Sequence, residues 1–212
     1  MIGIYDYTVI LTYLSVCSAT FGLLLAFTGH PTLAMFSLML SGFFDMFDGK
    51  VARTQKRKKD EIQFGIQIDS FADIIAFGVL PVAIGYSLGM DKWYFLPIAF
   101  IYVLAALIRL AYFNVKEEEL LSSKKDRSKV FVGLPTTSVA LILPLIFFFK
   151  HLFKKYFVFV YAGSLLIISI LFVLDKKFIK KPDTKKMIAF IFIGIIEIAL
   201  VFLGYKLWKI LI

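Results

Sequence analysis

Apolar stretches long enough to cross a bilayer recur along the whole sequence, and this feature restricts the fold more than any other. A membrane-spanning helix needs about 20 predominantly apolar residues, and the segments that separate these stretches are short. We expect spans at residues 7–28, 32–52, 62–89, 94–115, 130–149, 157–174 and 187–207. Composition agrees, since 60% of the residues are hydrophobic and the mean hydropathy is +0.85. The sequence predicts one all-α, polytopic membrane domain, with a six-helix core over residues 1–175 and an additional C-terminal span within residues 176–212.

Two further features concern the expected spans themselves. Pro81 and Pro144 lie inside spans, and we expect kinks or local unwinding at both, because proline has no N–H to donate. The N-terminal stretch has no basic region and no small-residue cleavage site. We therefore interpret it as a first span that is retained, and not as a signal peptide.

The net charge of +9 is distributed in a way that indicates membrane topology, and we expect no nucleic-acid partner. Three expected loops, at residues 56–59, 116–129 and 175–186, hold most of the 24 basic residues. Basic loops favour the cytoplasmic side of a membrane. We therefore expect a multi-pass protein of the cell membrane, with these loops and the N-terminus in the cytoplasm. Basic loops at a membrane surface also attract anionic lipids.

Four aspartates lie within this apolar sequence. Asp45 and Asp48 are three residues apart on the second expected span, and Asp69 and Asp73 are four apart on the third. Both spacings place the two side chains on one face of a helix. The segment between the spans is short, so the helices should be antiparallel neighbours whose acidic faces can meet near the cytoplasmic side.

The free-energy cost of placing charged aspartates in a membrane indicates what these four residues could bind. A charged aspartate at the bilayer centre costs about 2.5–3.5 kcal/mol on insertion scales, and like charges in one pocket repel. Divalent cations offset both effects, and a set of oxygen ligands suits Mg²⁺, Mn²⁺ or Ca²⁺. Four carboxylates can hold two such ions, as in phosphoryl transfer. The alternatives are protonation, pairing with Arg53 or Arg109, or a divalent-cation channel or transporter.

The residues around the aspartates carry a resemblance. The segment "DMFDGKVAR" (45–53) has the pattern D-x-x-D-G-x-x-A-R, and "GIQIDSFAD" (65–73) has the pattern G-x-x-x-D-x-x-x-D. Together they resemble the signature of the CDP-alcohol phosphotransferase family, with every fixed position present. The spacer between Arg53 and Gly65 is longer than is common in that family, and we interpret the extra residues as a change in the loop.

The resemblance implies an activity and a set of site residues. Members of the family transfer a phosphatidyl-type group from a CDP-activated lipid to an alcohol, release CMP, use divalent metal and form homodimers. By this resemblance Asp45, Asp48 and Asp69 are metal ligands, and Asp73 is the general base with a possible share in metal binding. The first span is where the family places polar nucleotide contacts, among which Thr12 and Ser15 are candidates. The expected contacts to the nucleotide and CDP-lipid are Ser15, Gly49, Ala52, Arg53 and Gly65.

Three segments indicate the acceptor alcohol. The segments "SFADIIAFGVLP" (70–81), "LIRLAYFNV" (107–115) and "FVGLPTTSVA" (131–140) resemble the phosphatidylserine synthase branch of the family. The chain departs from that branch at Tyr112 and Thr137. L-Serine is thus the expected acceptor, with glycerol 3-phosphate, inositol or inositol phosphate as alternatives. Acyl and isoprenoid lipid tails are not distinguished. Residues for the acceptor or its phosphate are Arg109, Asn114 and Thr136.

Overall fold

The structure, a computed structural model, describes residues 7–55, 58–123, 130–175, 177–180 and 194. Eight α-helices lie in this part of the chain, together with one π-helical segment, Ile74–Val79, that joins α3 to α4. The C-terminal span expected at residues 187–207 falls outside the described residues, apart from residue 194. The helices are α1 (Ile10–Phe27), α2 (Pro31–Val51), α3 (Lys59–Asp73), α4 (Leu80–Ser87), α5 (Leu96–Ser123), α6 (Val139–Phe148), α7 (Lys150–Phe153) and α8 (Phe157–Val173).

The helix boundaries follow from local sequence. Gly29 adopts a φ of +78° in the turn after α1, and Pro31 then occupies the first turn of α2, where its missing N–H costs nothing. At the start of α3, the backbone N–H of Lys58 donates to Glu61 Oε2 over 2.8 Å. Acidic residues in this first turn also favour the positive end of the helix dipole.

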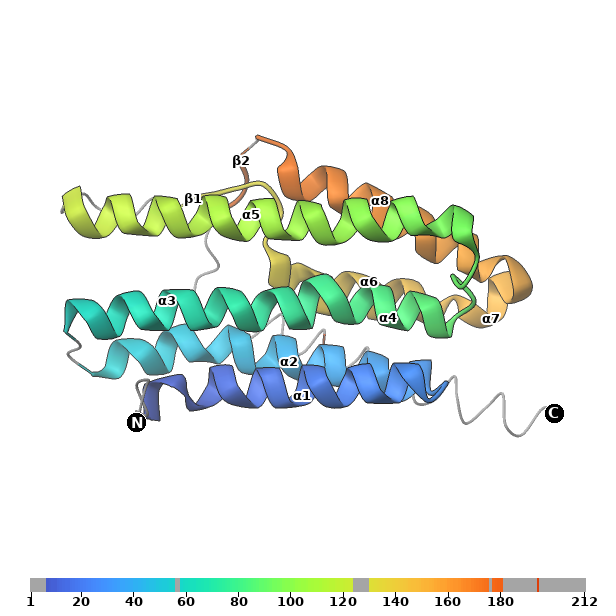
Figure 1. The fold of residues 1–212 in the computed structure, drawn as a ribbon, viewed down its shortest axis with the longest axis horizontal. Coiled ribbons are helices and arrows are strands. Elements are labelled where there is room, and N and C mark those ends of the chain that lie inside the picture. Colours follow the sequence, from blue (N-terminus) through green and yellow to red (C-terminus); the bar gives the residue numbers. More distant parts are fainter. Residues whose placement is uncertain (1–6, 56–57, 124–129, 176, 181–193, 195–212) are drawn as a thin grey trace.

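The architecture is that of a polytopic helical membrane protein, which confirms the predicted fold class. Among the described residues, four helical stretches are long and apolar enough to cross a membrane: Tyr7–Phe27, Asp60–Ser87, Trp93–Glu119 and Lys150–Val173. Helix α2, with 21 residues, is also long enough to cross a membrane, but its two aspartates lower its mean hydropathy, so it is not among these four stretches. The long helices run side by side, with the α2–α3 connection and the C-terminal end of α5 at the same end of the bundle (Figure 1).

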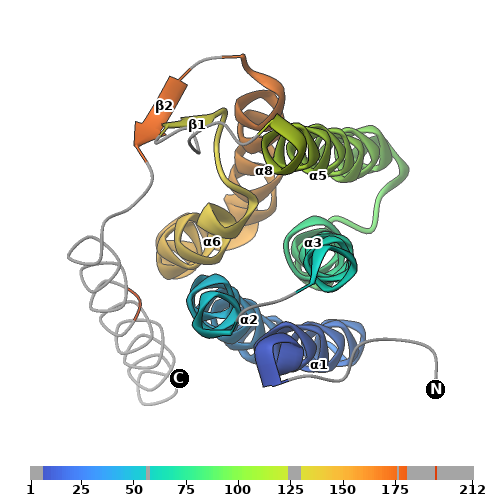
Figure 2. The same ribbon diagram turned by 90° about the vertical axis from the view of Figure 1, so that its left-hand side faces the viewer.

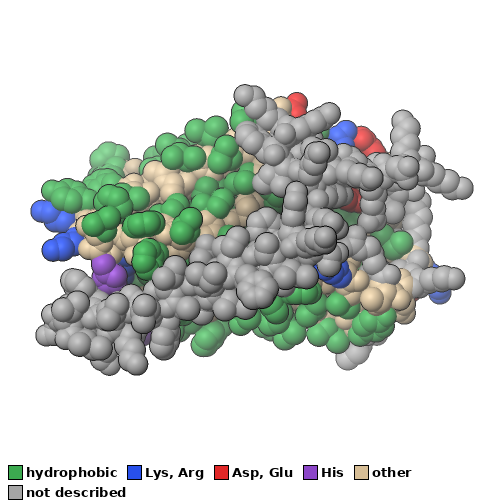
Figure 3. All heavy atoms as spheres, turned by 180° about the vertical axis from the view of Figure 1, so that it is seen from behind, with side chains coloured by type: hydrophobic (Ala, Val, Ile, Leu, Met, Phe, Trp, Pro, Cys, Tyr) green, Lys and Arg blue, Asp and Glu red, His purple; other side chains and the backbone are tan. Residues whose placement is uncertain are grey.

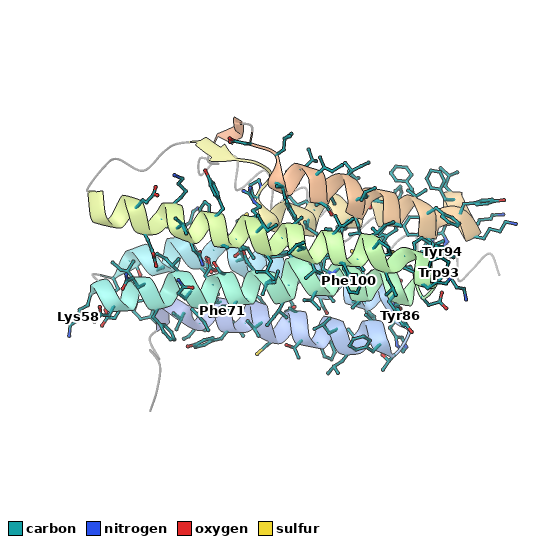
Figure 4. The ribbon with its side chains drawn as sticks, turned by 45° about the horizontal axis from the view of Figure 1, so that its top comes forward. Lys58, Phe71, Tyr86, Trp93, Tyr94 and Phe100 are labelled. Atoms are coloured by element: carbon teal, nitrogen blue, oxygen red, sulfur yellow. The ribbon has the colours of Figure 1, made fainter. Side chains whose placement is uncertain are left out.

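The outer surface agrees with a membrane environment. Hydrophobic side chains make up much of the described surface seen in Figure 3, and most of the charged side chains in this view lie toward its two ends. Tyr86, Trp93 and Tyr94 are exposed at one end of the bundle, and Lys58 lies at the opposite end (Figure 4). Aromatic residues of this kind are enriched where a membrane meets water.

The interior is formed by apolar side chains from α2, α4, α5, α6 and α8, and α1 lies against both α2 and α3 (Figure 2). Helices α2 and α6 approach closely at Gly42, where an added Cβ would overlap the Cβ of Ala140. The fully buried side chains include Leu38, Phe77, Leu80, Tyr102, Leu143 and Leu165.

The fifth expected span begins later than predicted. Residues 130–132 form strand β1 (Val130–Val132), which pairs antiparallel with β2 (Lys177–Lys180). Gly133 follows with a φ of +71°, and Pro135 has extended backbone angles, so helix α6 starts only at Val139. The prediction of a helix from residue 130 was wrong, because a left-handed glycine and a proline interrupt the apolar run.

The distortion expected at Pro81 is present. The π-helical segment Ile74–Val79 precedes Pro81, which lies in the first turn of α4. The Phe77 carbonyl lies four residues before Pro81 and receives no N–H from it. It accepts a hydrogen bond of 2.7 Å from the hydroxyl of Tyr102 on α5. Pro144 lies inside α6, where the helix continues through it.

Candidate active site between helices α2 and α3

Three carboxylates converge between α2 and α3. Carboxylate oxygens of Asp45, Asp48 and Asp69 lie within 4.8 Å of one another. The first two come from the C-terminal part of α2, and the third comes from α3. Helix α1 packs against both of these helices, which holds the two acidic faces beside one another. Carboxylates at this separation repel unless a proton or a cation lies between them.

The group has the properties of a cation site. Asp69 Oδ1 is buried and has no hydrogen-bond partner among the described residues. A buried oxygen without a partner is costly, and a divalent cation supplies the missing interaction. Asp48 is held from the other side, because Thr12 on α1 donates to its Oδ2 over 3.2 Å. A hydrogen bond of this kind orients a ligand carboxylate. The residues therefore fit a divalent cation held by oxygen ligands.

Asp73 lies next to this group at the last turn of α3. Its side chain is buried, and its carboxyl interacts with that of Asp45. Thr136 donates from Oγ1 to Asp73 Oδ2 over 3.0 Å. The three converging carboxylates do not include Asp73. The site thus combines three carboxylates suited to a cation with an adjacent carboxylate, held by Thr136, that can accept a proton.

Helix α5 contributes two of the expected acceptor residues. Asn114 Oδ1 accepts a hydrogen bond of 2.7 Å from Ser70, which lies between Asp69 and Asp73 in the sequence. Arg109 is buried and donates from Nη1 to the Phe172 carbonyl over 3.5 Å. Asn114 therefore faces α3 near the aspartates, whereas Arg109 faces the C-terminal end of α8.

The backbone at Gly133 also packs against Arg109. A Cβ at Gly133 would lie 2.5 Å from Arg109 Nη1 and 3.1 Å from the Phe172 carbonyl oxygen. The same turn is held to α8 by a hydrogen bond of 3.1 Å from the Leu134 N–H to the Leu171 carbonyl. Three residues after Gly133, Thr136 reaches Asp73. The segment 133–136 thus contacts Arg109 at one end and Asp73 at the other.

The expected nucleotide residues occupy different surroundings. Ser15 and Ser41 exchange hydrogen bonds of 3.2 and 3.1 Å, each hydroxyl donating to the carbonyl of the other residue, so Ser15 joins α1 to α2. Gly49 is exposed, and a Cβ there would meet no atom of the described residues within 4 Å. Ala52 and Gly65 are half-buried.

The backbone of Arg53 lies in the 3-10 segment Ala52–Thr54, directly after α2. The hydroxyls of Tyr7 and Thr54 are 2.9 Å apart, which connects this segment to the start of the chain's first helix. Sequence reasoning missed this contact, the Ser70–Asn114 pair and the close approach of Gly133 to Arg109. The position of Ser70 inside the motif was a signal that could have identified it. No sequence pattern marks the other two.

Known proteins are similar to this chain over the region that contains these residues. The sequence model of the CDP-alcohol phosphatidyltransferase family matches residues 8–174. A Saccharomyces cerevisiae protein named CDP-diacylglycerol–serine O-phosphatidyltransferase is 40% identical over 121 residues, which are 55% of this chain and 43% of that protein. The chain therefore spans less than half the length of this relative.

Two archaeal proteins are also similar. A Methanocaldococcus jannaschii protein with the same name as the yeast relative is 32% identical over 175 residues, 81% of this chain and 75% of that protein. An archaetidylserine synthase from Methanothermobacter thermautotrophicus is 33% identical over 135 residues, 63% of this chain and 54% of that protein. The matched family region contains all four aspartates.

Proposed function

Because the chain belongs to the CDP-alcohol phosphatidyltransferase family, we propose that it transfers a phosphatidyl-type group from a CDP-activated lipid to the hydroxyl of L-serine and releases CMP. The observation that carries the proposal is the convergence of Asp45, Asp48 and Asp69 beside Asp73, within the family's own motif. The names of the yeast and archaeal relatives support serine as the acceptor.

Asp45, Asp48 and Asp69 hold one or two divalent cations in this proposal, with Mg²⁺ and Mn²⁺ as the candidates. Bound cations supply charge neutralisation at the pyrophosphate and at the departing CMP. The unpartnered Asp69 Oδ1 and the hydrogen bond from Thr12 to Asp48 support the assignment. Both indicate carboxylates that are arranged in advance to accept a cation.

Asp73 acts as the general base. It takes the proton from the serine hydroxyl while the serine oxygen bonds to the lipid-side phosphorus and the bond from that phosphorus to the CMP oxygen breaks. Its burial and its place beside Asp45 support this role, because a base must lie within reach of both the acceptor and the bound pyrophosphate.

The nucleotide lies against the start of the motif in this proposal. Gly49 leaves open space into which a ligand can approach the backbone, and Arg53 offers a cationic group for phosphate. Ala52, Gly65 and Ser15 remain predicted nucleotide contacts. Arg109 and Asn114 are proposed to bind the acceptor, since a guanidinium suits the carboxylate of serine.

We propose that the protein lies in the cell membrane as one catalytic domain, with its active site toward the cytoplasm and a second copy as partner. Lys58 and the C-terminal end of α5 lie at the end of the bundle where α2 ends, which supports this orientation. The lipid substrate would then reach the aspartates from the surrounding bilayer.

The experiment uses purified full-length protein with Mn²⁺, labelled L-serine and either CDP-diacylglycerol or its isoprenoid ether analogue. We expect labelled lipid and stoichiometric CMP with at least one of the two donors. Unlabelled glycerol 3-phosphate and inositol should not compete with serine, and the Asp69→Asn variant should be inactive. Absence of both products with either donor would overturn the proposal. In proteoliposomes, we expect no Mn²⁺ flux, which separates this function from a cation channel or transporter.

A further inference from the structure

The hydrogen bond from Thr136 to Asp73 connects two separate parts of the fold. Asp73 ends α3, whereas Thr136 begins the 3-10 segment Thr136–Ser138 before α6. Both side chains are buried, with exposed fractions of 6% for Thr136 and 8% for Asp73. Water therefore has little access to replace this hydrogen bond if the hydroxyl is removed.

The backbone fixes the position of Thr136 independently of α3. The left-handed turn at Gly133 and the backbone bond from Leu134 to Leu171 anchor the segment to α8. Pro135 then restricts the chain directly before Thr136. The hydroxyl thus comes from a rigid support, which is the condition under which a donor can orient a neighbouring carboxylate.

A hydrogen bond to one oxygen restrains the rotation of a carboxylate and therefore the direction of its other oxygen. Asp73 needs such restraint, because it lies where α3 passes into the π-helical segment Ile74–Val79 and beside the Asp45 carboxyl. Without the hydroxyl, rotation of the Asp73 side chain would change its distance from the reacting proton. Errors of about 1 Å in such positions cost roughly 100-fold in rate.

We propose that Thr136 is a positioning residue whose hydroxyl holds the Asp73 carboxylate toward the acceptor alcohol. This inference rests on the proposed function and replaces the expectation that Thr136 binds the acceptor. The two roles differ in a measurable way. A residue that binds serine changes KM for serine, whereas a residue that orients the base changes kcat.

The test compares Thr136→Val, which keeps the shape and loses the hydroxyl, with Thr136→Ser, which keeps the hydroxyl. Thr137→Val is the matched control, since Thr137 is the half-buried neighbour in the same 3-10 segment. Turnover is measured over a range of serine concentrations, and Mn²⁺ affinity is measured separately by electron paramagnetic resonance of the free ion.

We expect Thr136→Val to lower kcat by roughly 10- to 100-fold while KM for serine and the Kd for Mn²⁺ stay within about twofold. Thr136→Ser should recover most of kcat, and Thr137→Val should match the wild type. A raised KM with unchanged kcat, a loss equal in the valine and serine variants, or a fully active Thr136→Val enzyme would each overturn the inference. Turnover of the wild-type protein tests the proposed function alone. An inactive wild type would overturn both proposals. With an active wild type, the variants test the role of Thr136 separately.

Discussion

The hydroxyl of Tyr102 donates a hydrogen bond to the carbonyl of Phe77, the residue four positions before Pro81. Because Pro81 has no N–H to donate, this side chain from α5 supplies a donor to a carbonyl that the residue four positions later cannot serve. The bond lies one turn after Asp73, so it also supports the π-helical segment that connects the Asp73 end of α3 to α4.

Replacement of Tyr102 by Phe should destabilise the protein by about 1–2 kcal/mol, because a buried carbonyl loses its donor while the ring packing remains. Thermal unfolding in detergent measures the effect. Tyr86→Phe is the control, since the Tyr86 side chain is 58% exposed and should not change the unfolding temperature. Equal stability of the two variants would show that the Phe77 carbonyl gains nothing from Tyr102.

Replacement of Asp73 by Asn should lower turnover by about 10²- to 10⁴-fold, the range attributed to a general base. Because Asp73 is not among the three converging carboxylates, binding of Mn²⁺ and of CDP-lipid should persist. Isothermal titration of the variant with each ligand checks this. Loss of Mn²⁺ binding together with turnover would identify Asp73 chiefly as a metal ligand.

Mn²⁺ should stabilise the wild-type protein against thermal unfolding, by about 2.7 kcal/mol at a concentration 100 times its Kd. Chelation of the metal should remove this stabilisation and the turnover together. Asp69→Asn should abolish the response because Asp69 belongs to the converging group, whereas Asp60→Asn should retain it. Asp60 lies exposed in the first turn of the same helix and serves as the control. An unchanged response in Asp69→Asn would contradict the assigned site.

Substitution of Gly49 by Leu should leave the fold intact and weaken CDP-lipid binding at least about tenfold, because the added side chain fills the space in which the nucleotide is proposed to lie. No atom of the described residues lies within 4 Å of a Cβ at Gly49 or at Gly163, which is on α8. Gly163→Leu is therefore matched in helix propensity and free space. Comparable binding by both variants would remove Gly49 from the nucleotide site.

Substitution of Gly133 by Ala should cost about 1–3 kcal/mol and reduce turnover, since the new Cβ would combine backbone strain with a collision against Arg109. Gly29→Ala separates the two causes. Gly29 has a similar φ of +78°, but a Cβ there meets no described atom within 4 Å. We expect only the strain at Gly29, visible in thermal unfolding, and full activity. Turnover lost equally in both variants would exclude a specific role for the Arg109 contact.

The sequence predicted the features that depend on periodicity and composition. The spacing of the aspartate pairs on two helices predicted a shared acidic face, and the structure places Asp45, Asp48 and Asp69 together. The long apolar runs predicted the helical membrane architecture, which the structure confirms. Both features depend on residue spacing and on the length of apolar runs, which can be read within one helix.

Features that depend on distant contacts were not predictable in this way. Thr136 and Asp73 are 63 residues apart, and Phe77 and Tyr102 are 25 apart. Each pairing depends on how helices are rotated relative to one another, which spacing within one helix does not determine. The start of α6 was also missed, because the apolar run from residue 130 outweighed the Gly133 and Pro135 signals in the choice of span.

The pairing of β1 with β2 joins the chain before α6 to the chain after α8, so the two ends of this quarter of the protein are hydrogen-bonded to each other. Asp73 lies outside the segment that β1 and β2 close, and Thr136 lies inside it. Their hydrogen bond therefore joins this segment to α3. A ligand that separated these two parts would break the hydrogen bond and free the Asp73 carboxyl to rotate, whereas a ligand that brought them together would preserve its orientation.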